Sequence, residues 1–178
     1  MVFPSIPSSA LSSIGTIIKK VLINRITIKI DNTKSNHKLH HGKRFLGNSL
    51  IKPLPVTIGH GGAESIEFKS VFKKAIGMIT YEIDNKHEGD LPLLLVVGWK
   101  ISIIEKNKWF VFIGYETDPN FPDERFVNKY LKENGNTGSN TLDFKEHSMI
   151  IDCSISDGNN AQLNIYIHSW GLLDRIFS

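Results

Sequence analysis

The feature that most constrains this chain is the recurrence of short runs in which apolar and polar residues alternate. Ile26, Ile28 and Ile30 alternate with polar neighbours near the start, and apolar residues recur at 151, 153 and 155 and at 163, 165 and 167. A period of two is typical of strands that bury one face. Turn signals such as Asp157-Gly158 separate these alternating runs. The runs and turns together predict a mainly β fold of about eight to ten strands.

The middle of the chain predicts a central hairpin. Leu91–Ile104 is a long apolar run, too short to span a membrane. We expect it to be a strand that is covered on both faces for part of its length. Glu105–Asn107 would form the turn and Lys108–Glu116 the returning strand. Residues 34–62 and 134–141 are less regular; the second segment, rich in polar residues, is expected to be a loop.

One late helix is expected after Pro122. Asp123 offers an N-cap, Glu124 places a negative charge in the first turn, and Gly135 supplies a stop. The apolar face of this helix would consist of Phe126, Val127, Tyr130 and Leu131. Two packed sheets with helices on their flanks would bury these strands.

The amino-terminal segment has a different pattern. Residues 1–9 hold two prolines and three serines and are expected to form a flexible arm. Residues 10–22 have apolar side chains at steps of three and four, which favours a short amphipathic helix. Gly15 weakens this helix, so it needs a surface to lie on. Its apolar residues are Leu11, Ile14, Ile17, Ile18, Val21 and Leu22, with Lys19 and Lys20 on the other side.

A length of 178 residues favours one domain, 1–178, made of the arm and helix (1–22), a sandwich (23–168) and an apolar tail (169–178). The single cysteine, Cys153, excludes an internal disulfide and is expected to be buried. The net charge of +3 is too mild for a typical nucleic-acid binder but favours anionic surfaces. We therefore expect no nucleic-acid partner.

No catalytic or metal-binding constellation emerges from the sequence. His37, His40 and His41 cluster, but no carboxylate or cysteine with ligand spacing stands nearby, and a solvated loop is the favoured interpretation. Glu64 and Glu67 fit the exposed face of a strand. We expect neither enzymatic activity nor a cofactor.

Several short motifs follow one another along the chain. A basic strand ends in Asp31-Asn32, and Ile58–Gly61 reads Ile-Gly-His-Gly. Ala75–Tyr81 reads Ala-Ile-Gly-Met-Ile-Thr-Tyr, Trp109–Tyr115 opens with Trp-Phe, and a Gly-Asn-Asn-Ala turn occupies 158–161. Together they resemble the actinoporin family of pore-forming cytolysins, from about residue 12 to residue 168.

The resemblance implies a two-sheet sandwich with an amphipathic helix at its amino end and a late helix. It implies a secreted protein that binds membrane lipids, inserts the helix around 11–22 into the target-cell membrane and oligomerises into a pore. Lysines in that helix, with no acid, predict weak cation selectivity or an anion preference. The lipid-binding residues that the resemblance implies are Ser49, Trp99, Lys106, Trp109, Phe126 and Tyr130.

This sequence departs from the family at the headgroup site. The stretch Gly98–Asn107 lacks nearly all the aromatic residues of the family's hairpin loop, and choline is held by aromatic faces. We therefore do not expect phosphocholine recognition. Two alternatives stay open: a lectin-like glycan-binding module without pore activity, and a non-lytic protein that uses the fold for protein contacts.

Overall fold

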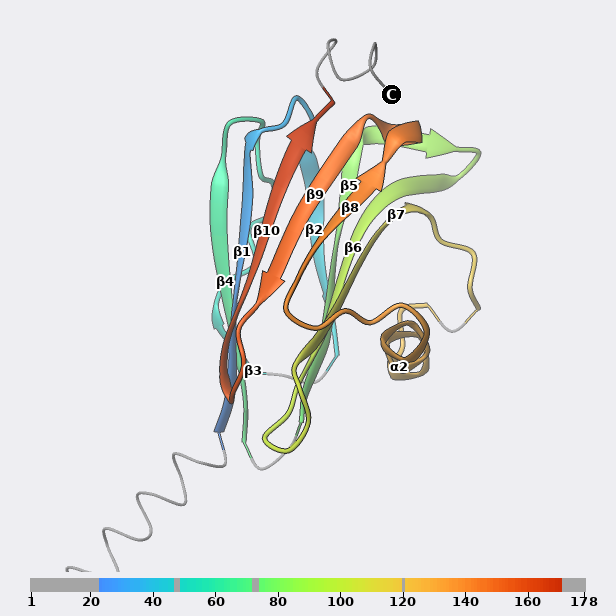
Figure 1. The fold of residues 1–178 in the computed structure, drawn as a ribbon. Helices are drawn as coiled ribbons and strands as arrows, with labels where there is room; N and C mark the ends of the chain where they lie inside the picture. The colour runs from blue at the N-terminus through green and yellow to red at the C-terminus, as the bar shows by residue number, and fades with distance from the viewer. Residues whose placement is uncertain (1–22, 47–48, 72–73, 120, 171–178) are drawn as a thin grey trace, which may run out of the picture.

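A computed structural model describes residues 23–46, 49–71, 74–119 and 121–170. Over these ranges the chain forms ten strands, one α-helix and a short 3-10 helix. The strands make two sheets packed face to face, and the helix lies against the smaller sheet (Figure 1). This is the mainly β sandwich with a late helix that the sequence predicts. The expected amino-terminal helix lies outside the described residues.

The larger sheet has six strands in the order β3-β4-β1-β10-β9-β8. Neighbours are antiparallel except β1 and β10, the first and last strands of the described chain, which run parallel side by side. A 3-10 helix, Lys145–His147, links β8 to β9. The strands are β3 (Ser49–Lys52), β4 (Ala63–Val71), β1 (Ile23–Lys34), β10 (Asn160–Ser169), β9 (Met149–Ile155) and β8 (Ser139–Phe144).

The smaller sheet has four antiparallel strands in the order β2-β5-β6-β7. Its long central hairpin, β6 with β7, is the one that the sequence predicts. The strands are β2 (Leu39–Phe45), β5 (Ala75–Glu88), β6 (Leu91–Ile101) and β7 (Lys108–Tyr115).

The core lies between the sheets, where the alternating apolar residues of β1, β9 and β10 point inward. The largest inward side chains are Trp99 of β6 and Trp109 of β7, and the ring of Trp99 lies 5.0 Å from that of Phe68. Leu95 and Val97 face this core, whereas Leu94 and Val96 lie in a second cluster beneath the helix. Strand β6 is therefore buried on both faces, as its unbroken apolar run predicts.

Helix α2 (Glu124–Glu133) begins where its capping residue predicts. The Asp123 carboxylate accepts hydrogen bonds from the backbone N–H groups of Arg125 and Phe126, at 2.8 and 3.0 Å. This satisfies two of the donors that every helix start leaves free. Phe126, Val127 and Leu131 then pack on the outer side of the four-stranded sheet.

Three strands fall in segments with no clear period. Strands β2 and β3 lie within 34–62, and β8 begins within the expected loop 134–141. All three are edge strands of their sheets. An edge strand is held by backbone hydrogen bonds to its one neighbour and needs no alternating apolar face, so periodicity does not reveal it. Every residue of β3 is exposed.

The beginning of the tail lies against the sandwich. The indole Nε1 of Trp170 donates to Asp143 Oδ1 at 3.2 Å, and the Lys145 ammonium lies 5.5 Å from the Trp170 ring centroid. Residues 171–178, the remainder of the predicted tail, lie outside the described part of the chain.

Candidate functional site

The β6–β7 hairpin ends in a tip, Ser102–Asn107, that exposes two isoleucines. Ile103 is 47% exposed and Ile104 is 94% exposed, the largest exposure of any large apolar side chain in the described residues. The tip projects from one end of the sandwich (Figure 1). Two adjacent exposed isoleucines at the end of the sandwich form a small apolar patch, and apolar patches rimmed by polar residues are where proteins contact membranes or partners.

The tip is held in place by polar side chains at its base. Ser102 Oγ accepts hydrogen bonds from the backbone N–H groups of Ile104 and Glu105, at 3.2 and 3.1 Å. Buried Asn107 accepts from the Ser102 N–H at 3.0 Å. Its Nδ2 donates to the carbonyls of Ser156 and Gly158 in the β9–β10 turn, at 2.9 and 2.7 Å. Ile104 is therefore presented on an ordered turn.

The charge around the tip is positive. Residues 100–108 contain three lysines and one acid, Glu105. The Glu105 carboxylate accepts from Lys100 Nζ at 2.5 Å and lies 3.5 Å from Lys74 Nζ, and these contacts, the Lys100 hydrogen bond first, lower its pKa. Since Glu105 is neutralised locally, Lys106 adds a positive charge directly beside the isoleucines.

The first described residue of β1 lies at the same end of the sandwich. The Asn159 amide of the β9–β10 turn donates to the Ile23 carbonyl at 3.2 Å, and the same turn holds Asn107. Ile23 also pairs with Val71, which is 45% exposed. The chain therefore enters the sandwich beside the tip (Figure 1).

A second feature is an aromatic cluster between α2 and β7. Phe110 and Phe112, two residues apart on β7, both face the helix. The rings of Phe112 and Tyr130 are stacked with centroids 5.1 Å apart, and Phe126 lies 4.6 Å from Tyr130. A hollow of about 490 Å³ borders Tyr130 and reaches β8. Burial raises the pKa of the Tyr130 hydroxyl above its usual value.

The six predicted lipid-binding residues lie in different environments. Trp99, Trp109 and Phe126 are completely buried, so their side chains offer no surface to a headgroup in this conformation. Lys106 is exposed on the tip and Tyr130 is half-buried in the cluster, whereas Ser49 is exposed on β3, in the other sheet. Phe126 and Tyr130 come together as predicted neighbours on one helix. The predicted membrane-inserting residues, 11–22, lie outside the described residues.

The sequence interpretation missed Ile103 and Ile104 as surface residues, because it continued the strand to residue 104. Strand β6 ends at Ile101 instead, and the chain bends over residues 103–105. The signal available was the hydrogen-bonding pair Ser102 and Asn107 around the expected turn. A serine or asparagine side chain that bonds nearby backbone favours a turn over a continuing strand.

The histidines predicted to lie in a solvated loop are placed differently. His37 is buried, with Nδ1 2.5 Å from Asp84 Oδ2, and His41 on β2 has Nδ1 2.8 Å from Glu82 Oε2. His37 and His41 each meet a carboxylate of β5, so these two pairs tie β2 and the segment just before it to β5. Among the described residues, no group of three or more His, Cys, Asp or Glu side chains is placed to hold a metal ion.

Two further observations bear on chemistry and membrane contact. Cys153 is buried, as predicted, and burial raises the pKa of its thiol well above the usual value, so the reactive thiolate is disfavoured. Within 23–46, 49–71, 74–119 and 121–170, no helix has the length and apolar character needed to cross a bilayer.

Comparison with known proteins yields a fold likeness only. No protein-family model and no curated protein sequence matches the chain. Among solved structures, the lipid-binding protein Nakanori matches with a TM-score of 0.59 and 12% identity, over 90% of this chain and 79% of that one. The lectin XCL of Xerocomus chrysenteron matches with a TM-score of 0.50 and 11% identity, over 82% and 99%. A mutated form of XCL gives 0.52 and 10%, over 82% and 97%. The sandwich is therefore a fold found in both a lipid-binding protein and a lectin.

Proposed function

We propose that this protein attaches to membrane surfaces through the β6–β7 tip. The observation that carries the proposal is the 94% exposure of Ile104 on a turn that Ser102 and Asn107 hold in place. Burying an isoleucine is worth roughly 1.5–3 kcal/mol. Each lysine near an anionic leaflet adds about 1 kcal/mol. Two isoleucines and several lysines together support reversible attachment with a preference for anionic lipids.

Attachment by the tip would bring the start of β1 to the membrane, because Ile23 lies at the same end. The amphipathic pattern of residues 10–22 would then meet the bilayer directly. We propose that this segment inserts and that several copies assemble into a pore, with the protein secreted before it reaches its target membrane. The sequence pattern and the place where the chain enters the sandwich support this step.

The test is sedimentation with phosphatidylcholine vesicles made with and without phosphatidylserine. We expect the intact protein to bind more strongly to the anionic vesicles, and more weakly as salt is raised. Replacing Ile104→Asp should weaken binding by roughly tenfold or more, since it removes the apolar contact and adds a negative charge. The fold should not change, because the side chain packs on almost nothing.

The matched control is Val56→Asp. Val56 is 69% exposed on the segment between β3 and β4, and its carbonyl accepts from the Gly42 N–H, beside the middle of β5. It should bind vesicles like the wild type. Dye trapped in the same vesicles reports the second step: a variant lacking residues 1–20 should bind but release no dye. Equal binding by wild type and Ile104→Asp would refute attachment by the tip, and unchanged dye release by the truncated variant would refute insertion of the segment.

A further inference from the structure

The outer face of the six-stranded sheet has an exposed aromatic residue near its centre. Tyr166 is 44% exposed, and it belongs to β10, a central strand that pairs with β1 on one edge and with β9 on the other. The side chains around it are polar, because the alternation of β1, β9 and β10 sends their apolar residues to the core. A tyrosine ring offers a flat apolar face with a polar hydroxyl at its edge, which suits a ligand that is apolar on one face and polar at its rim.

The strand register places a carboxylate on each side of this ring. Tyr166 is directly opposite Asp31 of β1 and Asp152 of β9. Strands lie about 4.8 Å apart, so the two aspartates begin from backbones about 10 Å apart with the tyrosine between them. Asp152 and Tyr166 belong to consecutive strands of one hairpin, whereas Asp31 is distant in sequence and reaches this row only through the parallel pairing of β1 with β10.

Both carboxylates are oriented by neighbouring side chains. Asp31 Oδ1 accepts from the Thr33 N–H at 2.9 Å and from the Thr33 hydroxyl at 2.5 Å. Asp152 Oδ1 accepts from the Thr141 hydroxyl at 2.6 Å, and its Oδ2 lies 3.0 Å from His168 Nε2. Each carboxylate keeps lone pairs for a ligand, since a carboxylate has about four acceptor sites. Such positioning lowers the entropy lost on binding.

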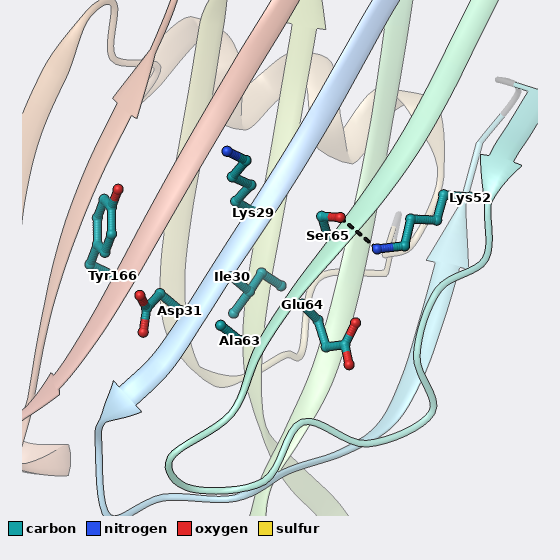
Figure 2. Close-up of a pocket in the computed structure, with 8 residues that line it drawn as sticks. All are labelled: Lys29, Ile30, Asp31, Lys52, Ala63, Glu64, Ser65 and Tyr166. Atoms are coloured by element: carbon teal, nitrogen blue, oxygen red, sulfur yellow. Dashed lines mark hydrogen bonds between the residues drawn. The ribbon is translucent and has the colours of Figure 1, made fainter.

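The ring of Tyr166 borders two hollows. One, of about 290 Å³, lies over β1 and β4 and is lined by Lys29, Asp31 and Ser65 as well. Figure 2 shows Tyr166 on one side of it and Lys52, bonded to Ser65 at 2.6 Å, on the other. The second, of about 370 Å³, lies over β8 and β9, where Ser139, Thr141, Asp152 and Ser154 line it. Because Tyr166 lines both hollows, a ligand that occupies the two hollows at once must lie over the Tyr166 ring.

We propose that this face is a binding site for a neutral saccharide of two or more pyranose units. The apolar face of one ring would stack on Tyr166, and sugar hydroxyls would donate to Asp31 and Asp152. The backbone groups of a central strand are already paired, so recognition must come from side chains, and this favours a ligand dense in hydroxyls over a peptide strand. Lys29 and Lys52 in the first hollow are balanced by Asp31 and Glu64, so Asp152 in the second hollow leaves one excess negative charge on this face, which disfavours sialylated or sulfated sugars.

The site is separate from the membrane-binding tip. Asp31 lies eight residues along β1 from Ile23, a distance of about 26 Å at 3.3 Å per residue. Attachment through the tip would leave this face open. The two activities can therefore be lost independently.

The test begins with the intact protein on a printed array of neutral, sialylated and sulfated oligosaccharides. We expect binding to a neutral glycan, confirmed by titration with that free oligosaccharide. Tyr166→Ala should lower its affinity about tenfold or more, and Asp152→Asn by a similar factor, since a hydrogen bond to a charged acceptor is lost. Tyr166→Phe keeps the ring and should retain most of the affinity.

Controls separate this proposal from the membrane proposal. Tyr166→Ala should bind anionic vesicles like the wild type, and Ile104→Asp should bind the glycan like the wild type. Unfolding curves should show that Tyr166→Ala is folded. The proposal is overturned if no neutral glycan on the array binds, if acidic glycans bind better than their neutral counterparts, or if Tyr166→Ala binds with unchanged affinity.

Discussion

Two glycines of the four-stranded sheet lie directly beneath aromatic rings. A Cβ at Gly98 would stand 2.1 Å from Phe110 Cε1, and a Cβ at Gly77 would stand 2.3 Å from Trp99 Cζ2. Carbon atoms in good contact are about 3.5–4.0 Å apart. The rings therefore occupy the space that any side chain at these positions would need. At the residue scale, the absence of two side chains shapes both cores of the molecule.

Gly98→Ala should lower the free energy of unfolding by about 1–3 kcal/mol, because Phe110 must move out of a packed cluster. Urea unfolding followed by tryptophan fluorescence measures the effect. The control is Gly59→Ala, where an added Cβ meets no atom within 4 Å; it should be neutral or slightly stabilising. A wild-type midpoint for Gly98→Ala would contradict the packing described for Phe110.

At the scale of elements, α2 shows how local signals and tertiary contacts combine. Its start is encoded locally by Asp123, whose carboxylate caps two backbone N–H groups. Its position depends on the β7 phenylalanines, since Phe110 and Phe112 contact Tyr130. A ten-residue helix is marginal alone, so the cap and the aromatic contacts both contribute to holding it.

Asp123→Ala should destabilise the protein by about 1 kcal/mol, the usual cost of losing an N-cap. Urea unfolding at neutral pH measures this loss. Asp123→Asn is the matched control, because asparagine caps as well as aspartate and should keep nearly all the stability. If the alanine and asparagine variants were equally destabilised, the loss would come from the charge and the capping role would be wrong.

The hairpin tip and the edge strands are also features of elements. The two isoleucines of the tip are exposed because β6 ends at Ile101, before them. The tip is then held by the hydrogen bond from Asn107 to the β9–β10 turn. The edge strands β2, β3 and β8 exist because a neighbour offers free backbone groups. Neither outcome is visible in the local pattern of apolar residues.

At the scale of the whole molecule, several carboxylates tie distant strands together. Burial acts to raise the pKa of Asp84, but hydrogen bonds from His37 and the Lys38 N–H outweigh it and hold the pKa below its usual value. Glu82 has a lowered pKa too, where burial is outweighed by His41 and Lys43. These pairs fasten β2 and the segment just before it to β5. Ionised carboxylates therefore stabilise this edge of the four-stranded sheet.

The protein should lose stability in acid. A group with a lowered folded pKa contributes stability that is complete above its unfolded pKa, about 4, and disappears as the pH falls through the folded value. We expect the free energy of unfolding, measured in urea, to fall from about pH 5 to about pH 2. Asp84→Asn should be less stable at neutral pH and should show a shallower fall. Asp90→Asn, at the exposed β5–β6 turn, should keep the wild-type slope; an unchanged slope in Asp84→Asn would contradict the role of its carboxylate.

The sequence by itself determined the class of fold and the direction of many side chains. Alternation in β1, β9 and β10 identifies which residues face the core, and the helix signals at Asp123 and Gly135 bracket α2. These features are local, because successive side chains of a strand point to opposite faces and a cap bonds within its own turn. The same alternation sends Tyr166 outward.

Only the tertiary structure decided which residues meet. The parallel pairing of β1 with β10 places Asp31 beside Tyr166, and the β9–β10 turn gathers the hairpin tip and Ile23 at one end. Strand order depends on the summed stability of many pairings between distant segments, and no single segment contains that information. The saccharide face consists of such distant residues, so the sequence did not indicate that site. The membrane-binding tip is a single contiguous turn, at which the sequence predicted Lys106 but not the exposure of Ile103 and Ile104.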